Sequence, residues 1–480
     1  MEPIQLGSQL GLFVDDHLID QLNGVKRTLH HPVPREVVIE HDEPWEGKHS
    51  GYHTIFADED VFRMYYRATS HQTEDHTAYA ESDDGIHWRK PDIGKYEVCG
   101  TKQNNIIIGP EVHRVSHNFT PFKDPTVKSG AEDKYKAVGS GDEGLMALHS
   151  ADGLNWTLID NEPLFTREQG AFDSQNLVFW DQVRDEYRAY FRYFDDGRRG
   201  IKTATSSDFR EWTDPVPLTY PDAPDEQLYT NGIKPYYREP HLFLGFPVRY
   251  VERDESSESM KELPGWKLRE QLINERGRQG FALTDVLFMS SRDGDTFNRW
   301  PRGFIRPGLW DKSTTANWFY GANGPAWQLI ETDSPIEEKP RELSLYAKEH
   351  ARGGPGVTDI NDQGATRLRR HALRIDGFVS VESSIEGGDL ITKPLIFEGN
   401  TLTMNYATSA AGFVNVELQE LDGTPIEGFS ITASAELFGD DIERTVEWTG
   451  NRSLEGLAGK PIRLRFHIVD GEIFSFRFDG

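Results

Sequence analysis

The sequence has almost no cysteine, since Cys99 is the single one among 480 residues. One cysteine excludes an intrachain disulfide framework and a cysteine-rich metal site. The residues just before it, Tyr-Glu-Val, are typical of the end of a strand. We therefore expect Cys99 to be a small buried apolar side chain and not a nucleophile.

Long apolar runs are also lacking. No stretch approaches the roughly 18 consecutive apolar residues of a membrane-spanning helix, so none is predicted. Residues 1–7 contain neither a basic nor an apolar stretch, so the chain as given shows no signal peptide. We expect a cytoplasmic protein, or a periplasmic or secreted one if a signal has been removed.

Positive charge is scarce. The 52 Lys and Arg residues face 79 Asp and Glu residues, which gives a formal net charge of −27. Because phosphate groups are bound mainly by cations, we predict no nucleic-acid partner and no membrane partner. The 36% of hydrophobic residues is enough for packed cores, and 480 residues suggest two to four domains.

Short runs of aromatic and β-branched residues dominate what is present. Clear examples lie at 61–67, 135–138, 177–180 and 187–192. Such runs, separated by turn residues, predict β-strands. Helical spacing is convincing only in 265–280, where Leu268, Leu272 and Glu275 lie between two glycines.

A turn motif recurs along the chain. Ser-Asp-Asp-Gly-Ile-His-Trp at 82–88 is echoed by Ser-Ala-Asp-Gly-Leu-Asn-Trp at 150–156, and degenerate copies lie at 206–212, 291–297 and 374–378. Their aspartates are Asp84, Asp152, Asp208, Asp293 and Asp376, at intervals of 68, 56, 85 and 83 residues. In such a turn the Asp side chain accepts local backbone N–H bonds and Gly takes a positive φ.

One hairpin turn every 56–85 residues fits a blade of four strands, so five copies predict a five-bladed β-propeller over residues 1–385. The strand at 12–14 is expected to join the last blade and close the ring. From residue 386 to 480 the alternating runs 401–407, 414–418, 463–468 and 473–478 predict a small β-sandwich.

In a propeller, the starts of the innermost strands converge on one central funnel, where polar side chains are site candidates. The segments upstream of the five predicted blades each combine an aromatic residue with polar or acidic groups. Facing carboxylates are what cleavage of a glycosidic bond requires, and aromatic rings offer flat faces to sugars. The candidate catalytic carboxylates are Asp124, Asp173, Glu226 and Glu46. The candidate substrate-binding residues are Arg67, His76, His53, His117, Arg192, Tyr229, Asn231, Trp318 and Tyr320.

These features resemble the five-bladed propeller glycoside hydrolases of families 32, 43 and 68. The segment Leu-Phe-Val-Asp-Asp at 12–16 and the C-terminal sandwich are similar to bacterial family 32-like proteins. Phe-Lys-Asp-Pro at 122–125 resembles the Arg-Asp-Pro segment of the family, which implies that Asp124 stabilises the transition state. The family's nucleophilic Asp and its acid/base Glu have no counterpart here. The departures leave Glu46 as nucleophile or base, Asp173 and Glu226 as acid and base, and indicate another sugar substrate.

The prediction is therefore an all-β glycoside hydrolase, exo-acting on an oligosaccharide or polysaccharide. No organic cofactor is expected, because no phosphate-binding glycine loop is present, and no metal-ligand spacing is recognisable among the histidines. A structural Ca²⁺ ion and a homo-oligomer are left open. The acidic segment and helix at 252–280 is interpreted as an insertion that forms a lid or a subunit contact, or neither.

Two alternatives remain. A six-bladed sialidase-like enzyme has similar turns, but it needs three clamping arginines and a Tyr–Glu nucleophile pair. A non-catalytic carbohydrate-binding propeller would explain the missing family Asp. The cluster Arg192, Arg198 and Arg199 could meet a carboxylated or sulfated sugar, although Asp195 and Asp196 balance it locally.

Overall fold

The computed structural model describes residues 2–70, 73–112, 115–128, 130–221, 223–254, 257–263, 265–309, 317–351, 365–450 and 452–480. The chain divides into two compact units. One comprises residues 32–333 and 343–372, and the other comprises 1–31, 334–342 and 373–480. This division differs from the predicted boundary after residue 385, because the first strands of the chain belong to the unit that contains the C-terminal strands.

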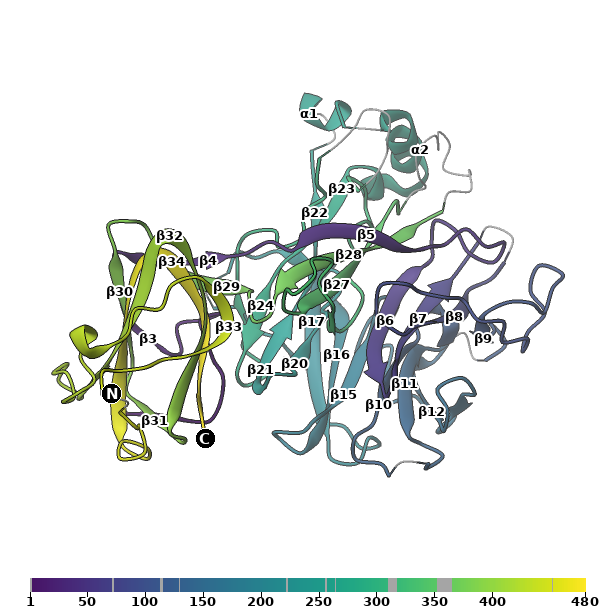
Figure 1. The fold of residues 1–480 in the computed structure, drawn as a ribbon. Helices are drawn as coiled ribbons and strands as arrows, with labels where there is room; N and C mark the ends of the chain where they lie inside the picture. The colour runs from purple at the N-terminus through teal and green to yellow at the C-terminus, as the bar shows by residue number, and fades with distance from the viewer. Residues whose placement is uncertain are drawn as a thin grey trace. The chain divides into compact units, whose positions relative to one another are not determined.

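The unit of residues 32–333 and 343–372 is a five-bladed β-propeller, as predicted (Figure 1). Blade one contains β6 (Gly51–Asp58), β7 (Val61–Ala68), β8 (His76–Ser82) and β9 (Ile106–Ile108). Blade two contains β10 (Thr120–Lys123), β11 (Tyr135–Ser140), β12 (Gly144–Ser150), β13 (Thr157–Leu158) and the extra strand β14 (Phe165–Thr166). Blade three contains β15 (Leu177–Asp181), β16 (Glu186–Asp195), β17 (Arg198–Ser206) and β18 (Val216–Pro217). Neighbouring strands of each of these blades are antiparallel.

Blade four carries the insertion. Its own strands are β20 (Lys234–Tyr236), β21 (Glu239–Gly245), β24 (Met289–Ser291) and β25 (Asn298–Arg299). The strands of a separate small sheet alternate with these in the sequence, namely β19 (Gln227–Leu228), β22 (Val248–Glu252) and β23 (Ala282–Val286). Between β22 and β23 lie α1 (Glu258–Lys261) and α2 (Trp266–Arg276), followed by a short 3₁₀ turn, η2 (Gly277–Gly280). The predicted helix at 265–280 is confirmed.

Blade five closes the ring with a strand from the start of the propeller. It contains β26 (Ile330–Thr332), β27 (Glu342–Glu349), β28 (Arg367–Arg374) and β5 (Val33–Glu40), which pairs antiparallel with β28. The prediction that residues 12–14 close the ring is wrong, because β2 (Gly11–Leu12) pairs with the last strand of the chain instead. Strand β5 removes the open edge that blade five would otherwise present.

The repeated turn follows the third strand of blades one to four and has one hydrogen-bonding pattern. In the first copy, Asp84 Oδ1 accepts the backbone N–H groups of Ile86 and His87, each at 2.8 Å. Trp88 Nε1 then donates to the Gly85 carbonyl at 3.0 Å, which holds the aromatic ring under the turn. Gly85, Gly153 and Gly294 have positive φ in their copies, and Phe209 takes the same conformation in the third.

Three of these four turns are also hydrogen-bonded to the preceding blade. Tyr346 of blade five donates to the Gly85 carbonyl at 2.5 Å, and Tyr190 of blade three donates to the Gly294 carbonyl at 2.8 Å. Arg63 of blade one donates to the Asp152 carbonyl at 2.6 Å. The motif therefore links neighbouring blades. The weak fifth copy does not follow this pattern, because Asp376 belongs to the unit of residues 1–31, 334–342 and 373–480, where its carboxylate accepts a hydrogen bond from Ser475 of the same unit.

The unit of residues 1–31, 334–342 and 373–480 is a β-sandwich with one shared core. Its strands are β1 (Ile4–Gly7), β2, β3 (Ile19–Asn23), β4 (Val25–Leu29), β29 (Val379–Ser383), β30 (Gly388–Thr392), β31 (Leu395–Phe397), β32 (Thr401–Gln419), β33 (Asp440–Thr445) and β34 (Pro461–Asp479). The four runs predicted from 401 onward are in fact two 19-residue strands, β32 and β34, paired antiparallel along their length. A short 3₁₀ turn, η3 (Ile431–Ala433), lies between β32 and β33.

Two smaller expectations can be compared with the structure. Cys99 is exposed, and its Sγ lies 3.5 Å from the Pro44 carbonyl oxygen, so the prediction of a buried side chain is wrong. The backbone at Cys99 is left-handed, which turns the side chain away from the strand-like direction assumed for it. Within the described ranges, no helix is long and apolar enough to cross a membrane.

Candidate active site

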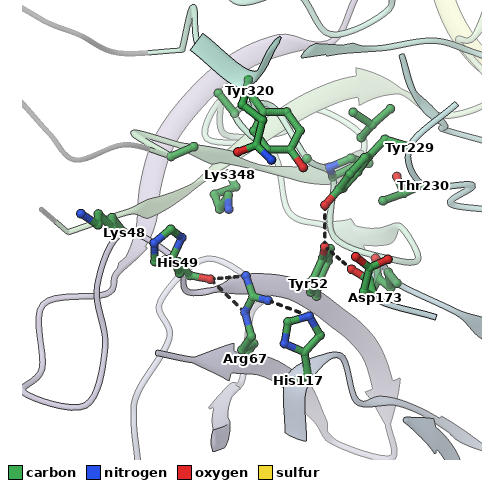
Figure 2. Close-up of a pocket in the computed structure, with 18 of the residues that line it drawn as sticks. Lys48, His49, Tyr52, Arg67, His117, Asp173, Tyr229, Thr230, Tyr320 and Lys348 are labelled. Carbon is green, nitrogen blue, oxygen red and sulfur yellow. Dashed lines mark hydrogen bonds between the residues drawn. The ribbon is translucent and has the colours of Figure 1, made fainter. Parts of the chain in front are cut away.

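A cavity of about 250 Å³ lies in the propeller, and segments of several blades line it (Figure 2). Five predicted site residues are among its walls, namely Arg67, His117, Asp173, Tyr229 and Tyr320. They come from strand ends and loops of five different regions of the chain, from β7 to the segment before β26. The expected convergence of distant blade segments on one site is therefore found for these five residues.

Asp173 presents an exposed carboxylate on a buried guanidinium. Arg192 of β16 forms an ion pair with Asp173, and the side chain of Arg192 is 2% exposed while that of Asp173 is 69% exposed. The Arg192 guanidinium also lies 5.2 Å from the ring centre of Tyr229. A buried cation in contact with a carboxylate holds that carboxylate in place and favours its charged form. Arg192 therefore contributes by positioning Asp173, although it does not itself line the cavity.

Tyr52, which the sequence analysis did not select, enters the cavity through a local distortion of β6. Its φ is +53°, and the register of β6 with β7 shifts between Gly51 and Thr54. Bulges of this kind redirect a side chain and are frequent near functional sites. The Tyr52 hydroxyl lies 3.0 Å from the Tyr229 hydroxyl and donates to the Asp173 carbonyl at 3.3 Å (Figure 2).

The two hydrogen-bonded tyrosines differ in acidity. Burial raises the pKa of Tyr52 well above its ordinary value. Burial acts in the same direction on Tyr229, but the Arg192 charge and hydrogen bonds from Tyr320 and Tyr52 outweigh it and lower the pKa of Tyr229. The Tyr229 ring also meets Tyr320 edge-on, with centroids 5.7 Å apart. Tyr229 is thus the more acidic hydroxyl of the pair.

Arg67 and His117 lie next to Tyr52, with the Arg67 guanidinium 4.8 Å and the His117 ring centre 6.4 Å from the Tyr52 ring centre. Arg67 donates from Nε and Nη2 to the His49 carbonyl at 3.0 and 2.6 Å, and its Nη1 lies 3.5 Å from His117 Nε2. His117 Nδ1 is bonded to the Asp75 carboxylate. Burial raises the pKa of Asp75, but the bond to His117 and the Arg67 charge prevail and lower it to about 2. Asp75 is therefore a permanent anion that orients His117.

A second cavity of about 450 Å³ adjoins the first, because both are lined by His117 and Asp173. Its other described walls include Glu74, Asp75 and Asp142, together with Arg167. Arg167 donates to the backbone carbonyls of Asp142 and Gly141, at 2.7 and 2.5 Å. The carboxylates that the sequence analysis placed around the funnel are thus present, but apart from Asp173 they are not the residues it named.

Several polar residues at blade starts hold neighbouring segments together instead of facing the cavity. Asn231, predicted to bind substrate, is buried, and its Nδ2 donates to the Tyr190 carbonyl at 3.4 Å. Asn118 donates to the carbonyls of Phe172 and Ser174. Trp327 contributes to the same region, since its Nε1 donates to the Ile233 carbonyl at 3.0 Å and its ring packs on Phe179. Several of the polar side chains at the blade starts, which suggested a binding site, therefore serve to connect neighbouring segments of the chain.

Asp124, predicted to stabilise the transition state, is a buried structural carboxylate. It accepts hydrogen bonds from Lys136, from Tyr187 at 2.6 Å and from Thr126 at 2.8 Å. Burial raises its pKa, but the Lys136 and Tyr187 contacts dominate and lower it. Asp124 lies outside the described lining of both cavities. Its partners lie within blades two and three, so these contacts give Asp124 a structural role there, and its predicted part in stabilising the transition state stays a prediction.

Glu46 and Glu226 also lie outside both cavities. The Glu46 side chain is fully covered, bonded to Lys90 and to Tyr66, each at 2.6 Å. Burial raises the pKa of Glu46, against the opposing effect of Lys90. Glu226 forms ion pairs with Arg249 at 2.7 Å and with Arg299 at 3.3 Å. Both carboxylates have cationic partners inside the fold, and their predicted catalytic roles stay predictions.

Three further predicted binding residues have internal partners. His53 is buried with its Nε2 3.0 Å from His41 Nε2, and burial lowers its pKa well below the ordinary value. His76 is buried with its Nδ1 2.7 Å from the Glu74 carbonyl oxygen. Trp318 donates from Nε1 to the Gly308 carbonyl at 3.0 Å. None of the three is part of the described cavity lining.

The described residues contain no cluster of three or more His, Cys, Asp or Glu side chains suited to a metal ion. The structural Ca²⁺ ion that the sequence left open therefore gains no ligand set in these ranges, and it stays a prediction.

Comparisons with known proteins give likenesses of fold only. No family model matches the sequence, and no curated protein matches it. Among solved structures, a family 43 arabinoxylan arabinofuranohydrolase from Bacillus subtilis is 11% identical, with 91% of this chain and 96% of that chain covered and a TM-score of 0.40. A family 32 β-fructofuranosidase from Bombyx mori is 9% identical, with 94% of each chain covered and a TM-score of 0.42. An N-acetylgalactosamine deacetylase from F. plautii is 11% identical, with 73% of this chain and 96% of that chain covered and a TM-score of 0.41. The resemblance to propeller glycoside hydrolases is thus met among solved structures, at scores that support no conclusion about activity.

Proposed function

We propose that the protein is a glycoside hydrolase whose scissile bond lies beside Asp173. The observation that carries this proposal is the position of Asp173 in the walls of both cavities. A saccharide that fills the two cavities places one sugar unit in each, and the bond between the units then passes Asp173 and His117. An exposed carboxylate at that point can act directly on the anomeric carbon or on a water molecule.

The contacts of Asp173 favour the role of nucleophile or base. Its carboxylate is paired with the buried guanidinium of Arg192, which favours the ionised form. The general acid must protonate the leaving oxygen, so it belongs on the side of the leaving sugar. Glu74 and Asp142 line that side and are the candidates. Asp75 is excluded as the acid because its pKa is lowered to about 2.

The sizes of the cavities support attack at a chain end. We call the cavity lined by Tyr52, Tyr229 and Tyr320 the inner cavity, and the adjoining cavity lined by Glu74 and Asp142 the outer cavity. The inner cavity, at about 250 Å³, is smaller than the roughly 300–1,000 Å³ typical of ligand pockets, so we assign it a single sugar unit. The outer cavity of about 450 Å³ has room for the unit that leaves. Tyr52, Tyr229 and Tyr320 provide apolar faces and hydroxyl groups for the inner sugar.

The test is a reducing-sugar screen over plant and algal oligosaccharides, followed by kinetics of Asp173→Asn on the best substrate. We expect a loss of turnover of at least about 1,000-fold with retained saccharide binding, because the amide cannot act as nucleophile or base. Asp225→Asn, an exposed acid paired with Arg198 outside both cavities, is the matched control. Full turnover in Asp173→Asn would overturn the proposal. Saccharide binding without turnover in the unaltered protein would establish the binding-only alternative instead.

The sialidase-like alternative is not supported. It requires six blades, and the described strands form five blades, with β5 completing the fifth. The small sheet of β19, β22 and β23 is an insertion in blade four and has three strands.

A further inference from the structure

The inner cavity is strongly cationic in a protein with a net charge of −27. Four cationic side chains line it, namely Lys48, Arg67, Arg276 and Lys348. The carboxylate among its described walls is Asp173, which is already paired with Arg192. Figure 2 shows Lys48, Lys348 and Arg67 on one side of the Tyr52–Tyr229 pair and Asp173 on the other.

Two of these cations have no carboxylate partner in the part of the chain that the structure describes. Arg67 contacts the neutral His49 carbonyl, and its guanidinium lies 4.8 Å from the ring centre of Tyr52. Asp75, on which the Arg67 charge acts, is hydrogen-bonded to His117 and Thr69. Arg276 forms no ion pair within the described ranges, and its side chain is exposed. Like charges gathered at a half-enclosed site repel one another unless an anion joins them.

The inserted segment contributes directly to this charge. Arg276 is the last residue of α2, and Gln279 of the following turn also lines the cavity. The helix is fixed by Arg269, whose buried guanidinium stacks on Phe319 at 3.8 Å and donates to the Trp318 carbonyl. Leu268 and Leu272 pack on Phe319 as well. The insertion is therefore anchored to the segment that carries Tyr320, and it delivers a cation to the inner sugar position.

We propose that the sugar bound in the inner cavity is a terminal uronic acid, whose carboxylate is recognised by Arg67, Lys348 and Arg276. This inference rests on the proposed function, because it specifies the substrate of the same site. A carboxylate replaces the hydroxymethyl group of a hexose with almost no added volume, which suits a cavity of about 250 Å³. A sulfate ester adds a bulkier tetrahedral group to the same ring. Charge-assisted hydrogen bonds from guanidinium and ammonium groups are well suited to a carboxylate.

The first test measures binding without catalysis. Glucuronic acid and galacturonic acid are titrated calorimetrically into the Asp173→Asn protein and compared with glucose, galactose and their 6-sulfates. We expect the uronic acids to bind at least about tenfold more tightly than the neutral sugars, as one charge-assisted hydrogen bond provides. Affinity should fall as salt increases. Equal binding of neutral sugars, or tighter binding of the sulfates, would overturn the inference.

The second test uses variants and turnover. Arg276→Gln and Lys348→Gln should each weaken uronic acid binding by about 10- to 100-fold, whereas Arg198→Gln, which removes a charge outside both cavities, should not. If neutral oligosaccharides are hydrolysed as fast as those ending in a uronic acid, the inference fails while the proposed hydrolase stands. If uronic acids bind selectively but no oligosaccharide is cleaved, the hydrolase fails while the anionic specificity stands.

Discussion

The carboxylate of Asp173 rests on the guanidinium of Arg192, so that an exposed anion is held by a cation that is 2% exposed. The same guanidinium lies under the Tyr229 ring. One buried side chain thus sets both the position of the proposed reacting group and the acidity of a neighbouring hydroxyl. This relationship makes Arg192 the first residue to alter.

Replacing Arg192 with Gln should lower kcat by about 10- to 100-fold on the substrate identified by the screen, because Asp173 loses the cation that positions it. KM should change less, since Arg192 lies outside the described cavity lining. Arg192→Lys should recover part of kcat, because it restores the charge without the planar fork. Equal losses in the Gln and Lys variants, accompanied by a lower melting temperature, would indicate a purely structural role.

Tyr229 should ionise at lower pH than an ordinary tyrosine, since Arg192 and hydrogen bonds from Tyr320 and Tyr52 lower its pKa. A titration followed by ultraviolet tyrosinate absorbance should show one early ionisation in the unaltered protein. Tyr229→Phe should remove that step, whereas Tyr193→Phe should not, because burial raises the pKa of Tyr193. An unchanged early step in Tyr229→Phe would contradict the assignment.

The contribution of the hydrogen bond between blade five and the turn of blade one to stability should be measurable by comparing Tyr346→Phe with the unaltered protein. The Tyr346 hydroxyl donates to the Gly85 carbonyl at 2.5 Å in a buried position, and in its absence that carbonyl keeps the hydrogen bond from Trp88 Nε1 at 3.0 Å. We expect the free energy of unfolding to fall by about 0.5–1.5 kcal/mol, the contribution of one hydrogen bond, measured by urea denaturation. Tyr193→Phe serves as the control. A loss below the uncertainty of the measurement would show that the turn does not depend on this contact.

The propeller should lose stability as the pH falls from about 6.5 to about 4. His350 and His371 are buried, and burial lowers the pKa of each to about 4. Since an unfolded histidine takes up a proton near pH 6.5 and these do not, protons favour the unfolded state across that interval. Each of these two histidines should lower the free energy of unfolding by up to about 1.4 kcal/mol for each pH unit of acidification in that interval. Unfolding free energies at a series of pH values should show a shallower decline in His371→Asn than in His149→Asn, and parallel curves would refute this.

Asp124→Asn should affect stability and leave the chemistry intact. Breaking the buried contact leaves Lys136 with the more exposed Asp133, at 3.4 Å, as its remaining described anion, and we expect the free energy of unfolding to fall by about 1–3 kcal/mol. The kcat of the folded fraction should stay within about twofold of the unaltered protein, because Asp124 lies outside both described cavity linings. A large fall in kcat without a fall in melting temperature would return Asp124 to the catalytic site.

The blades could be predicted from the sequence because the signal that marks them is local. A Ser, an Asp, a Gly and an aromatic residue within seven positions determine the turn by themselves, as the contacts of Asp84 and Trp88 show. The third copy is degenerate because Phe209 occupies the left-handed position that Gly fills elsewhere. The ring-closing strand was missed because its pairing joins residues far apart in the sequence, Val33–Glu40 and Arg367–Arg374.

The candidate site was harder to predict, since a carboxylate is available for chemistry only if nothing inside the fold neutralises it. In the sequence, the segments around Asp124, Glu46 and Glu226 resemble the segment around Asp173. In the structure, however, these three carboxylates form ion pairs with Lys136, Lys90 and Arg249, respectively. These partners are up to 44 residues away, as with Lys90 and Glu46. Tyr52 was missed for another reason, because only a distortion of β6 directs it into the cavity.

The interleaving of the two units has a practical consequence for dissecting the protein. The chain begins in the sandwich with β1 to β4, leaves to build the propeller, and returns with β29 to β34. A fragment ended at residue 385 would keep Leu6, Phe13 and Leu18, whose apolar side chains are covered by residues beyond that point. Such a fragment would expose these apolar side chains to solvent and aggregate, so a minimal propeller has to begin near residue 32.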